Sequence, residues 1–102
     1  MTVSAAIQIL PKTENDEELI RIVDEVIAYI ASKGLNYYVG PFETTIEGED
    51  YGQIMEIVAE CSRVAVNAGA PEVSAYIKTV WKPEGGVLTI LNSLIFDKNF
   101  NS

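Results

Sequence analysis

The spacing of apolar and polar residues divides the chain into alternating strand-like and helix-like stretches. From Val3 to Leu10, apolar residues occupy every second position and polar Ser4 and Gln8 fall between them, which predicts a strand with one face on a core. Val73–Trp81 alternates in the same way and predicts a second strand of this kind. The second faces of these strands suit a ligand, a partner subunit or solvent, and the pattern favours the last two.

Two helices are predicted between the strands. The first is expected to begin at the side-chain oxygens of residues 13–16, to run to about Ser32, and to be closed by Lys33-Gly34. The second is expected to begin at Asp50, where Gln53 completes a capping box. Apolar residues at three- and four-residue spacings predict their buried stripes: Leu19, Ile22, Val23, Val26, Ile27 and Ile30 in the first helix, and Ile54, Ile57, Val58, Cys61, Ala65 and Ala68 in the second.

The stretch from Leu35 to Asp50 lies between the two helices and predicts a β-hairpin. Aromatic and β-branched residues are interrupted by Gly40-Pro41, which favours a turn between strands at Asn36–Val39 and Phe42–Ile46. Polar residues alternate with apolar ones in and after the second strand, which is unusual for a strand deep in a sheet, so this hairpin is a candidate site. These polar residues are Thr44, Thr45 and Glu47.

The predicted order of elements is β-α-β-β-α-β. Two right-handed β-α-β crossovers bring four strands into one antiparallel sheet with both helices on one face. The expected fold is therefore an α+β ferredoxin-like sandwich, with residues 1–102 forming a single domain. Apolar residues at helical spacing from Val87 to Ile95 predict a short C-terminal helix, although VLTIL also fits a strand.

One face of this sheet carries no helix, and its predicted residues include Leu10, Tyr76 and Val80 among small polar side chains. This mixture is more apolar than a solvated surface favours. We therefore expect the C-terminal tail or a second copy of the chain to cover the face, and we predict a homo-oligomer, either a dimer or a tetramer.

Charge and composition narrow the range of partners. Seven Lys and Arg against fifteen Asp and Glu give a net charge of −8, which repels nucleic acids and anionic membranes but tolerates a neutral or cationic small ligand. No apolar run approaches the roughly 20 residues that a membrane-spanning helix needs. The first residues lack the basic start of a signal peptide, and Cys61 is the only cysteine, so a cytoplasmic location is expected.

The chain lacks the residues that most catalytic and metal-binding sites require. Without histidine and with one cysteine, the chain has no ligand set for zinc or an iron–sulfur cluster. The glycine-rich phosphate-binding motifs and the serine-hydrolase motif are also missing. Cys61 falls on a buried helix stripe and has no histidine to activate it. A carboxylate such as Glu47 remains the one candidate for acid–base catalysis, and a protein without enzymatic activity is expected.

The hairpin resembles a known family. The similarity spans about residues 3–80 and rests on residues that match its segment GL-x-Y-x-L-x-P-M-x-T-x-x-EGE: Gly34-Leu35, Tyr37, Val39, Gly40-Pro41-Phe42, Thr44, Ile46 and Glu47-Gly48-Glu49. This is the thiamine-binding-protein family, which includes relatives of YkoF. Phe42 replaces the usual Met, and the tail from Val80 departs from the more charged end of the family. The resemblance implies a ferredoxin-like fold, assembly as dimers or tetramers, and binding of thiamine or its hydroxymethylpyrimidine part.

Carried onto this chain, the resemblance implies that Thr44, Glu47 and Gly48 bind the ligand. An aminopyrimidine has an NH₂ donor and ring-nitrogen acceptors, which a hydroxyl and a carboxylate can satisfy. Tyr37 or Tyr38 can stack on the ring, but neighbouring strand residues point to opposite faces, so one of them at most lines a given pocket. Gln8 completes the predicted ligand-binding set.

Alternatives stay open at the level of sequence. Thr44 also fits an ordinary strand residue, and Glu47-Gly48 also fits a plain turn before the Asp50 cap. The main functional hypothesis is a non-catalytic binder of thiamine or hydroxymethylpyrimidine that acts as a carrier, buffer or sensor. A structural or regulatory protein-interaction module without a small ligand is the alternative, and an enzyme that uses the Glu47 carboxylate is a third hypothesis.

Overall fold

Six regular elements follow one another in the predicted β-α-β-β-α-β order in the computed structural model, which describes residues 1–87. They are β1 (Val3–Pro11), α1 (Asp16–Ser32), β2 (Asn36–Val39), β3 (Thr44–Gly48), α2 (Tyr51–Asn67) and β4 (Val73–Trp81). The predicted C-terminal helix lies outside the described residues.

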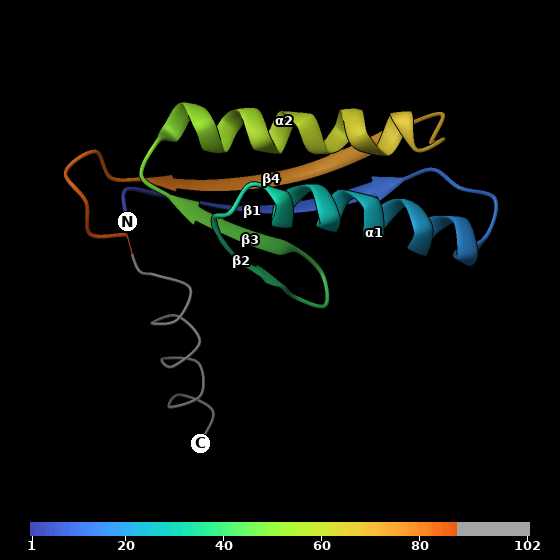
Figure 1. Ribbon diagram of the computed structural model, residues 1–102, viewed down its shortest axis with the longest axis horizontal. Helices are drawn as coiled ribbons and strands as arrows, with labels where there is room; N and C mark the ends of the chain where they lie inside the picture. Colours follow the sequence, from blue (N-terminus) through green and yellow to red (C-terminus); the bar gives the residue numbers. More distant parts are fainter. Residues whose placement is uncertain (88–102) are drawn as a thin grey trace, which may run out of the picture.

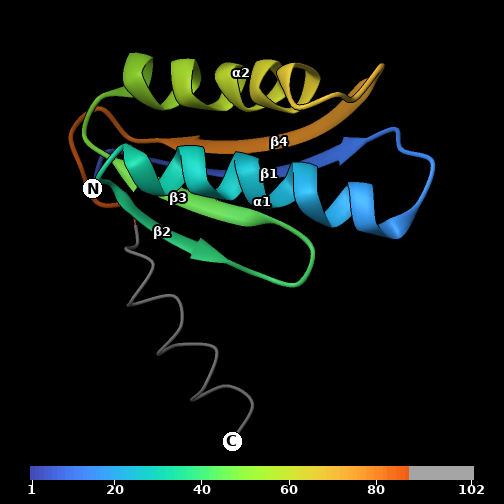
Figure 2. The same cartoon turned by 45° about the vertical axis from the view of Figure 1, so that its right-hand side comes forward.

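The four strands form one antiparallel sheet in the order β2-β3-β1-β4. Both helices lie on the same side of this sheet, as Figures 1 and 2 show from two directions. We call this side the helix face and the other side the open face. The arrangement confirms the predicted ferredoxin-like α+β sandwich. It also places β1 in the interior of the sheet and leaves β2 and β4 as edge strands.

The predicted helix starts are confirmed by their caps. The Asn15 side chain accepts a hydrogen bond of 2.9 Å from the Glu18 backbone N–H, and the Asp50 side chain accepts one of 3.0 Å from the Gln53 N–H. Each satisfies a backbone donor that the first helical turn leaves unpaired. Past the end of α1, Gly34 adopts a φ of +73°, a backbone conformation that a residue with a side chain rarely adopts.

The hairpin turn is longer than predicted, so the expectation that its second strand begins at Phe42 is wrong. The Gly40 N–H donates a 2.9 Å hydrogen bond to the Glu43 carbonyl, which closes residues 40–43 into the turn and delays β3 until Thr44. A β-carbon on Gly40 would lie 2.9 Å from that carbonyl oxygen, closer than real β-carbons come. Glycine is therefore required at the point where the chain reverses.

The core lies between the sheet and the two helices. It consists of inward side chains of β1 and β3 and one stripe from each helix: Val3, Ala5, Ile7, Ile22, Val26, Ile30, Ile46, Ile54, Ile57, Val58, Cys61, Ala65 and Ala70. The stripe predicted for α1 is wider than the part that is fully buried, because Leu19, Val23 and Ile27 are only partly covered. The uncovered part of the stripe faces the hairpin and lines the site described next.

Candidate functional site

The predicted ligand-binding residues fall on two faces of the sheet. Thr44 pairs with Ile7 of β1 and with Val39 of β2, and these side chains share the helix face. Glu47 pairs with Ser4 and with Asn36, on the open face. Tyr37 belongs with Thr44, whereas Tyr38 and Gln8 belong with Glu47. No pocket on one face can therefore use the side chains of all the predicted residues.

Glu47 lies on the open face but is almost fully buried, at 2% exposure. Its carboxylate accepts a 3.1 Å hydrogen bond from the Asn36 side-chain amide across the β2–β3 ladder. This contact ties the edge strand to its neighbour. Gly48 faces α2 instead, and a β-carbon there would lie 3.3 Å from the Ile54 Cδ1. Gly48 thus allows close packing of β3 against α2.

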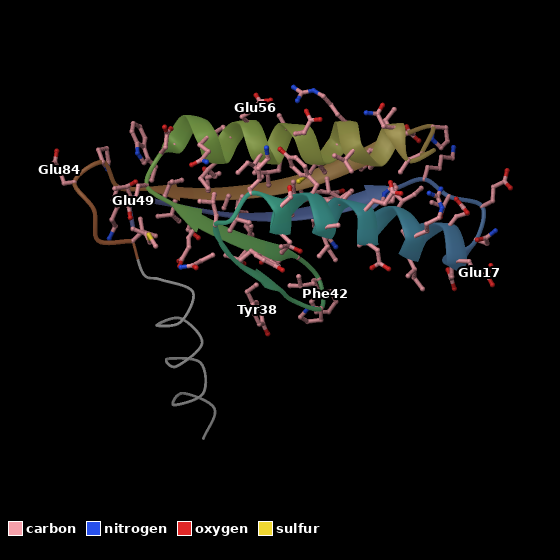
Figure 3. The ribbon with its side chains drawn as sticks, viewed as in Figure 1. Glu17, Tyr38, Phe42, Glu49, Glu56 and Glu84 are labelled. Carbon is pink, nitrogen blue, oxygen red and sulfur yellow. The ribbon has the colours of Figure 1, made fainter. Side chains whose placement is uncertain are left out.

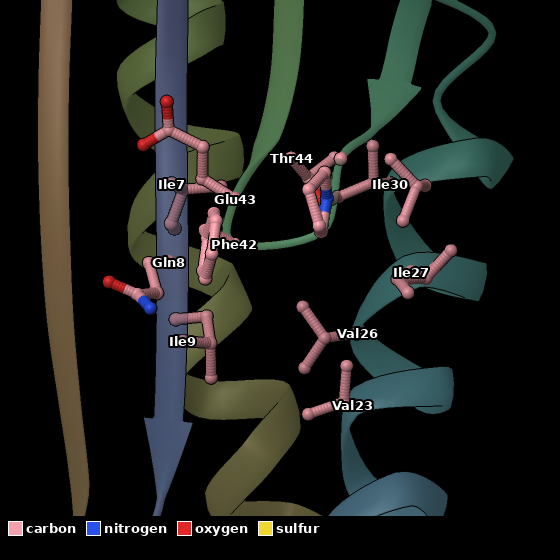
Figure 4. A pocket seen from close by; sticks show the side chains of 13 residues that line it. Ile7, Gln8, Ile9, Val23, Val26, Ile27, Ile30, Phe42, Glu43 and Thr44 are labelled. Carbon is pink, nitrogen blue, oxygen red and sulfur yellow. The ribbon is translucent and has the colours of Figure 1, made fainter.

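A small cavity on the helix face opens between α1, β1 and the hairpin. We call it the inner chamber, and its volume is about 130 Å³. Figure 4 shows Val23, Val26, Ile27 and Ile30 of α1 on one side and Ile7 and Ile9 of β1 on the other, with Phe42 and Thr44 of the hairpin between them. The backbone turn at residues 39–41 completes the wall. The chamber is a mostly apolar slot at the end of the hairpin.

Thr44 of β3 lines this slot with a polar side chain. The side chain lies on the helix face of the sheet and is 8% exposed. Gln8 also lines the chamber, but its amide points away from α1 in Figure 4. Glu43, at the rim, is directed toward β4 through a 3.4 Å contact with the Lys78 ammonium. Among the described lining residues, the Thr44 hydroxyl is therefore the side-chain group best placed to hydrogen-bond a ligand in the slot.

A second, wider cavity continues from the first one. We call it the outer chamber, and its volume is about 330 Å³. The two chambers share the lining residues Gln8, Ile9, Val23, Pro41 and Phe42, so they adjoin, and we call the two together the groove. Phe42 is 80% exposed, and Figure 3 shows it at the tip of the hairpin. Its position at the junction of both chambers makes it part of the wall of each.

Sequence reasoning did not select several residues of this groove. Val23 and Ile27 were assigned to the core, and neither Phe42 nor Asp24 was assigned to the site. One signal was present: the apolar stripe of α1 is wider than a helix needs to cover one side of a small sheet. The exposed aromatic residue next to Gly40-Pro41 was a second signal.

The largest of these hollows lies elsewhere, at the loops that precede α1 and follow α2. Its volume is about 500 Å³ and its wall includes Lys12, Glu14 and Glu18. Two of these charges are already engaged, since Lys12 lies 3.9 Å from Glu72 and Glu18 lies 2.7 Å from Arg21. The Arg21 contact holds the pKa of the Glu18 carboxyl below its usual range. More charged side chains line this hollow than line the groove, so it is a poorer fit for a flat, weakly polar ring.

The remaining reactive groups offer little chemistry. Cys61 is fully buried between α2 and the sheet, and burial raises the pKa of its thiol to about 11. A thiol of this kind stays protonated near neutral pH and is a poor nucleophile. Within residues 1–87 no group of three or more His, Cys, Asp or Glu side chains is arranged to hold a metal ion. The helices of the same region are too short or too polar to span a bilayer.

Comparison with known proteins places the chain in a family. A family model described as thiamine-binding protein matches residues 5–90. The chain belongs to the thiamine-binding protein family. The resemblance seen in the hairpin is thereby confirmed, and the match covers the strands and helices described above except for the first two residues of β1.

Two proteins that are similar to this chain have the name UPF0045. A UPF0045 protein of Clostridium perfringens is 41% identical over 86 residues, which cover 84% of this chain and 87% of the relative. A UPF0045 protein of Mycobacterium bovis is 39% identical over 62 residues, 61% of this chain and 60% of the relative. The names of both relatives state no activity.

Solved structures agree with the fold of the thiamine-binding protein family. A candidate thiamine biosynthesis/salvage protein of Thermotoga maritima superimposes with a TM-score of 0.80 at 30% identity, covering 95% of this chain and 99% of that one. A domain of unknown function, DUF77, from Bacillus cereus gives a TM-score of 0.78 at 31% identity, covering 87% and 83% of the two chains.

Proposed function

We propose that this protein binds thiamine or its hydroxymethylpyrimidine part without altering it chemically, in the role of a carrier, buffer or sensor. The observation that carries the proposal is the inner chamber, an apolar slot with the Thr44 hydroxyl in its wall. Membership of the thiamine-binding protein family gives the slot a ligand class.

The chemistry of an aminopyrimidine fits this slot. The faces of the ring are flat and weakly polar, so they pack well against the branched side chains of Val23, Val26 and Ile30. The ring edge has donors and acceptors, and a threonine hydroxyl can serve either kind. A volume of about 130 Å³ is below the roughly 300–1,000 Å³ typical of ligand pockets. The inner chamber therefore suits one ring, with the rest of a larger ligand outside it.

Calorimetric titration with thiamine and with hydroxymethylpyrimidine tests the proposal. We expect saturable heat and a rise in melting temperature with at least one of them, because a ligand that binds only the folded state stabilises it. The absence of both heat and thermal shift at millimolar ligand would refute the proposed function. Recovery of the two compounds unchanged after incubation supports a non-catalytic role, whereas turnover that is lost in Glu47→Gln would support an enzyme.

We also propose that the chain forms a homo-oligomer. The support is β4, an edge strand in which Tyr76, Ile77, Val80 and Trp81 are all exposed. Exposed apolar side chains beside an unpaired strand edge are features that a second copy would cover. Light scattering at micromolar concentration tests this: a mass near 11.2 kDa that does not change on tenfold concentration contradicts it.

The same surface supports the second candidate function, a protein-interaction module without a small ligand. This candidate function is supported if the calorimetric titrations show no binding of either compound and the pure protein binds one specific partner through β4. Substituting Tyr76 and Val80 with serine should then abolish that interaction. If a ligand binds in the groove, the module hypothesis is no longer needed to explain the site.

A further inference from the structure

We propose that the outer chamber binds a cationic ring, so that the groove is selective for the two-ring molecule thiamine over free hydroxymethylpyrimidine. This inference rests on the proposed function, since it places the pyrimidine in the inner chamber and adds a role for the space beside it. It assigns the thiazolium part of the ligand to the residues of α1 and β1 that line the outer chamber alone.

The lining of the outer chamber has one charge. Its residues beyond those shared with the inner chamber are Leu10, Leu19, Ile20 and Asp24. Among all the described residues that line it, Asp24 alone is charged, and no lysine or arginine lies in this wall. None of the ion pairs within residues 1–87 includes Asp24. The chamber therefore presents a negative charge on an apolar wall.

A thiazolium ring complements this wall. Its positive charge is fixed, because the ring nitrogen is alkylated and has no proton to lose. A nearby carboxylate attracts it, and the face of an aromatic ring such as Phe42 attracts a cation within about 6 Å. The net charge of −8 favours the approach of a cation to the protein as a whole. An anionic second group would be repelled by Asp24, and an uncharged one would lack the attraction between opposite charges.

The shape of the groove agrees with a two-ring ligand. The chambers share five lining residues, so they lie side by side. Thiamine has two rings joined by a single methylene carbon, which matches two adjoining spaces of unequal size. Hydroxymethylpyrimidine would fill the inner chamber and leave the apolar wall of the outer chamber exposed to water. Ile20 is 60% exposed, and covering it adds a favourable hydrophobic contribution to the free energy of binding. Only the larger ligand reaches far enough to cover it.

The experiment compares both ligands on variants of the full chain. Calorimetry with thiamine and with hydroxymethylpyrimidine gives two dissociation constants for the wild type, Asp24→Asn and Ile20→Ala. We expect each substitution to raise the thiamine constant about two- to fivefold and the pyrimidine constant less than twofold, as exposed charge and apolar contacts contribute modestly. Added salt should weaken thiamine binding more than pyrimidine binding, and this difference should shrink in Asp24→Asn.

Glu25→Gln is the matched control. It removes the same charge from the neighbouring position of α1, but Glu25 lies 3.8 Å from Arg21 and does not line the groove. It should leave both constants within twofold of the wild type. If it weakens thiamine as much as Asp24→Asn does, the effect is only that of net charge, and the proposal is wrong.

Failure of this inference is distinguishable from failure of the proposed function. If the wild type binds neither ligand, the proposed function falls and this inference falls with it. If the wild type binds both ligands equally well, or if Asp24→Asn and Ile20→Ala change the two constants in parallel, the outer chamber has no separate role. The proposed function stands in that case.

Discussion

Thr44 and Glu47 belong to the same five-residue strand, yet they lie on opposite faces of the sheet. An odd separation along a strand always has this result, because successive side chains point to alternate faces. The two residues therefore cannot contact one small ring together. Their separate surroundings, a groove for Thr44 and a hydrogen-bonded strand pair for Glu47, lead to different expectations for their substitution.

Thr44→Val should weaken ligand binding while leaving the fold intact. The substitution removes a hydroxyl at nearly constant volume, and the loss of one neutral hydrogen bond costs about 0.5–1.5 kcal/mol, or about two- to tenfold in affinity. Calorimetry with hydroxymethylpyrimidine measures it. Thr45→Val is the control, because Thr45 is the next residue of β3 and faces the open side. Equal losses in both variants would contradict a site in the inner chamber.

Glu47→Gln should lower stability more than it lowers affinity. The carboxylate is buried and accepts the Asn36 hydrogen bond, so an amide in its place disturbs the link between β2 and β3. Weakening a buried, charge-assisted hydrogen bond costs about 1–3 kcal/mol. Urea unfolding and calorimetry together give the two quantities. Loss of ligand binding at unchanged stability would instead place the site on the open face.

Ile57→Ala should cost about 2–5 kcal/mol in the free energy of unfolding, as expected for a large-to-small change in a packed core. Ile57 is 3% exposed on the inner side of α2. Val66→Ala on the outer side of the same helix is the control, since Val66 is 51% exposed and should cost less than about 1 kcal/mol. Denaturant titration compares them, and similar costs for both would mean that the packing of α2 is described incorrectly.

Stability should fall as the pH rises through the alkaline range because of Cys61. Burial raises the pKa of its thiol from 9.0 to about 11, so the folded chain keeps a proton that the unfolded chain releases. This contribution is complete below pH 9.0 and is lost between there and about 11. The steepest slope is about 1.4 kcal/mol per pH unit.

Urea unfolding of the wild type and Cys61→Ala between pH 8 and 11 measures this slope. Burial also raises the pKa of Tyr29, and the nearby Cys61 adds to this shift. Tyr29 therefore acts in the same direction, and Cys61→Ala removes part of its effect as well. The slope should therefore be shallower in Cys61→Ala. Parallel pH profiles would show that Cys61 does not titrate differently in the folded and unfolded chains.

The order of elements could be predicted from sequence because each boundary has a local chemical cause. Asn15 and Asp50 cap the helices with their own side chains, and alternation defines β1 and β4. The start of β3 could not be predicted, since it depends on a turn hydrogen bond between Gly40 and Glu43 that propensity does not reveal. Propensity rules describe the preference of each residue in its local sequence, whereas this turn depends on how the backbone groups of Gly40 and Glu43 meet in space.

The site was predicted less completely than the fold. The family resemblance selected a short run that includes both Thr44 and Glu47, and sequence proximity alone made them appear to be one site. The groove needs α1 as its second wall, and contacts between α1 and the hairpin cannot be inferred from either segment alone. Val23 and Asp24 were therefore recognised as lining residues of the groove only when the two elements were seen side by side.

The pairing of β1 with β4 along nine residues has a consequence for synthesis of the chain. Within residues 1–87, the strand made first lies inside the sheet, but one of its two neighbours is the strand made last. Until residues 73–81 have left the ribosome, β1 can have only β3 beside it among the described strands, and its other edge is open to any extended segment. Long-range strand pairing of this kind is slow, and unpaired edges invite association. The nascent protein thus depends on residues 73–81 for protection of its earliest strand.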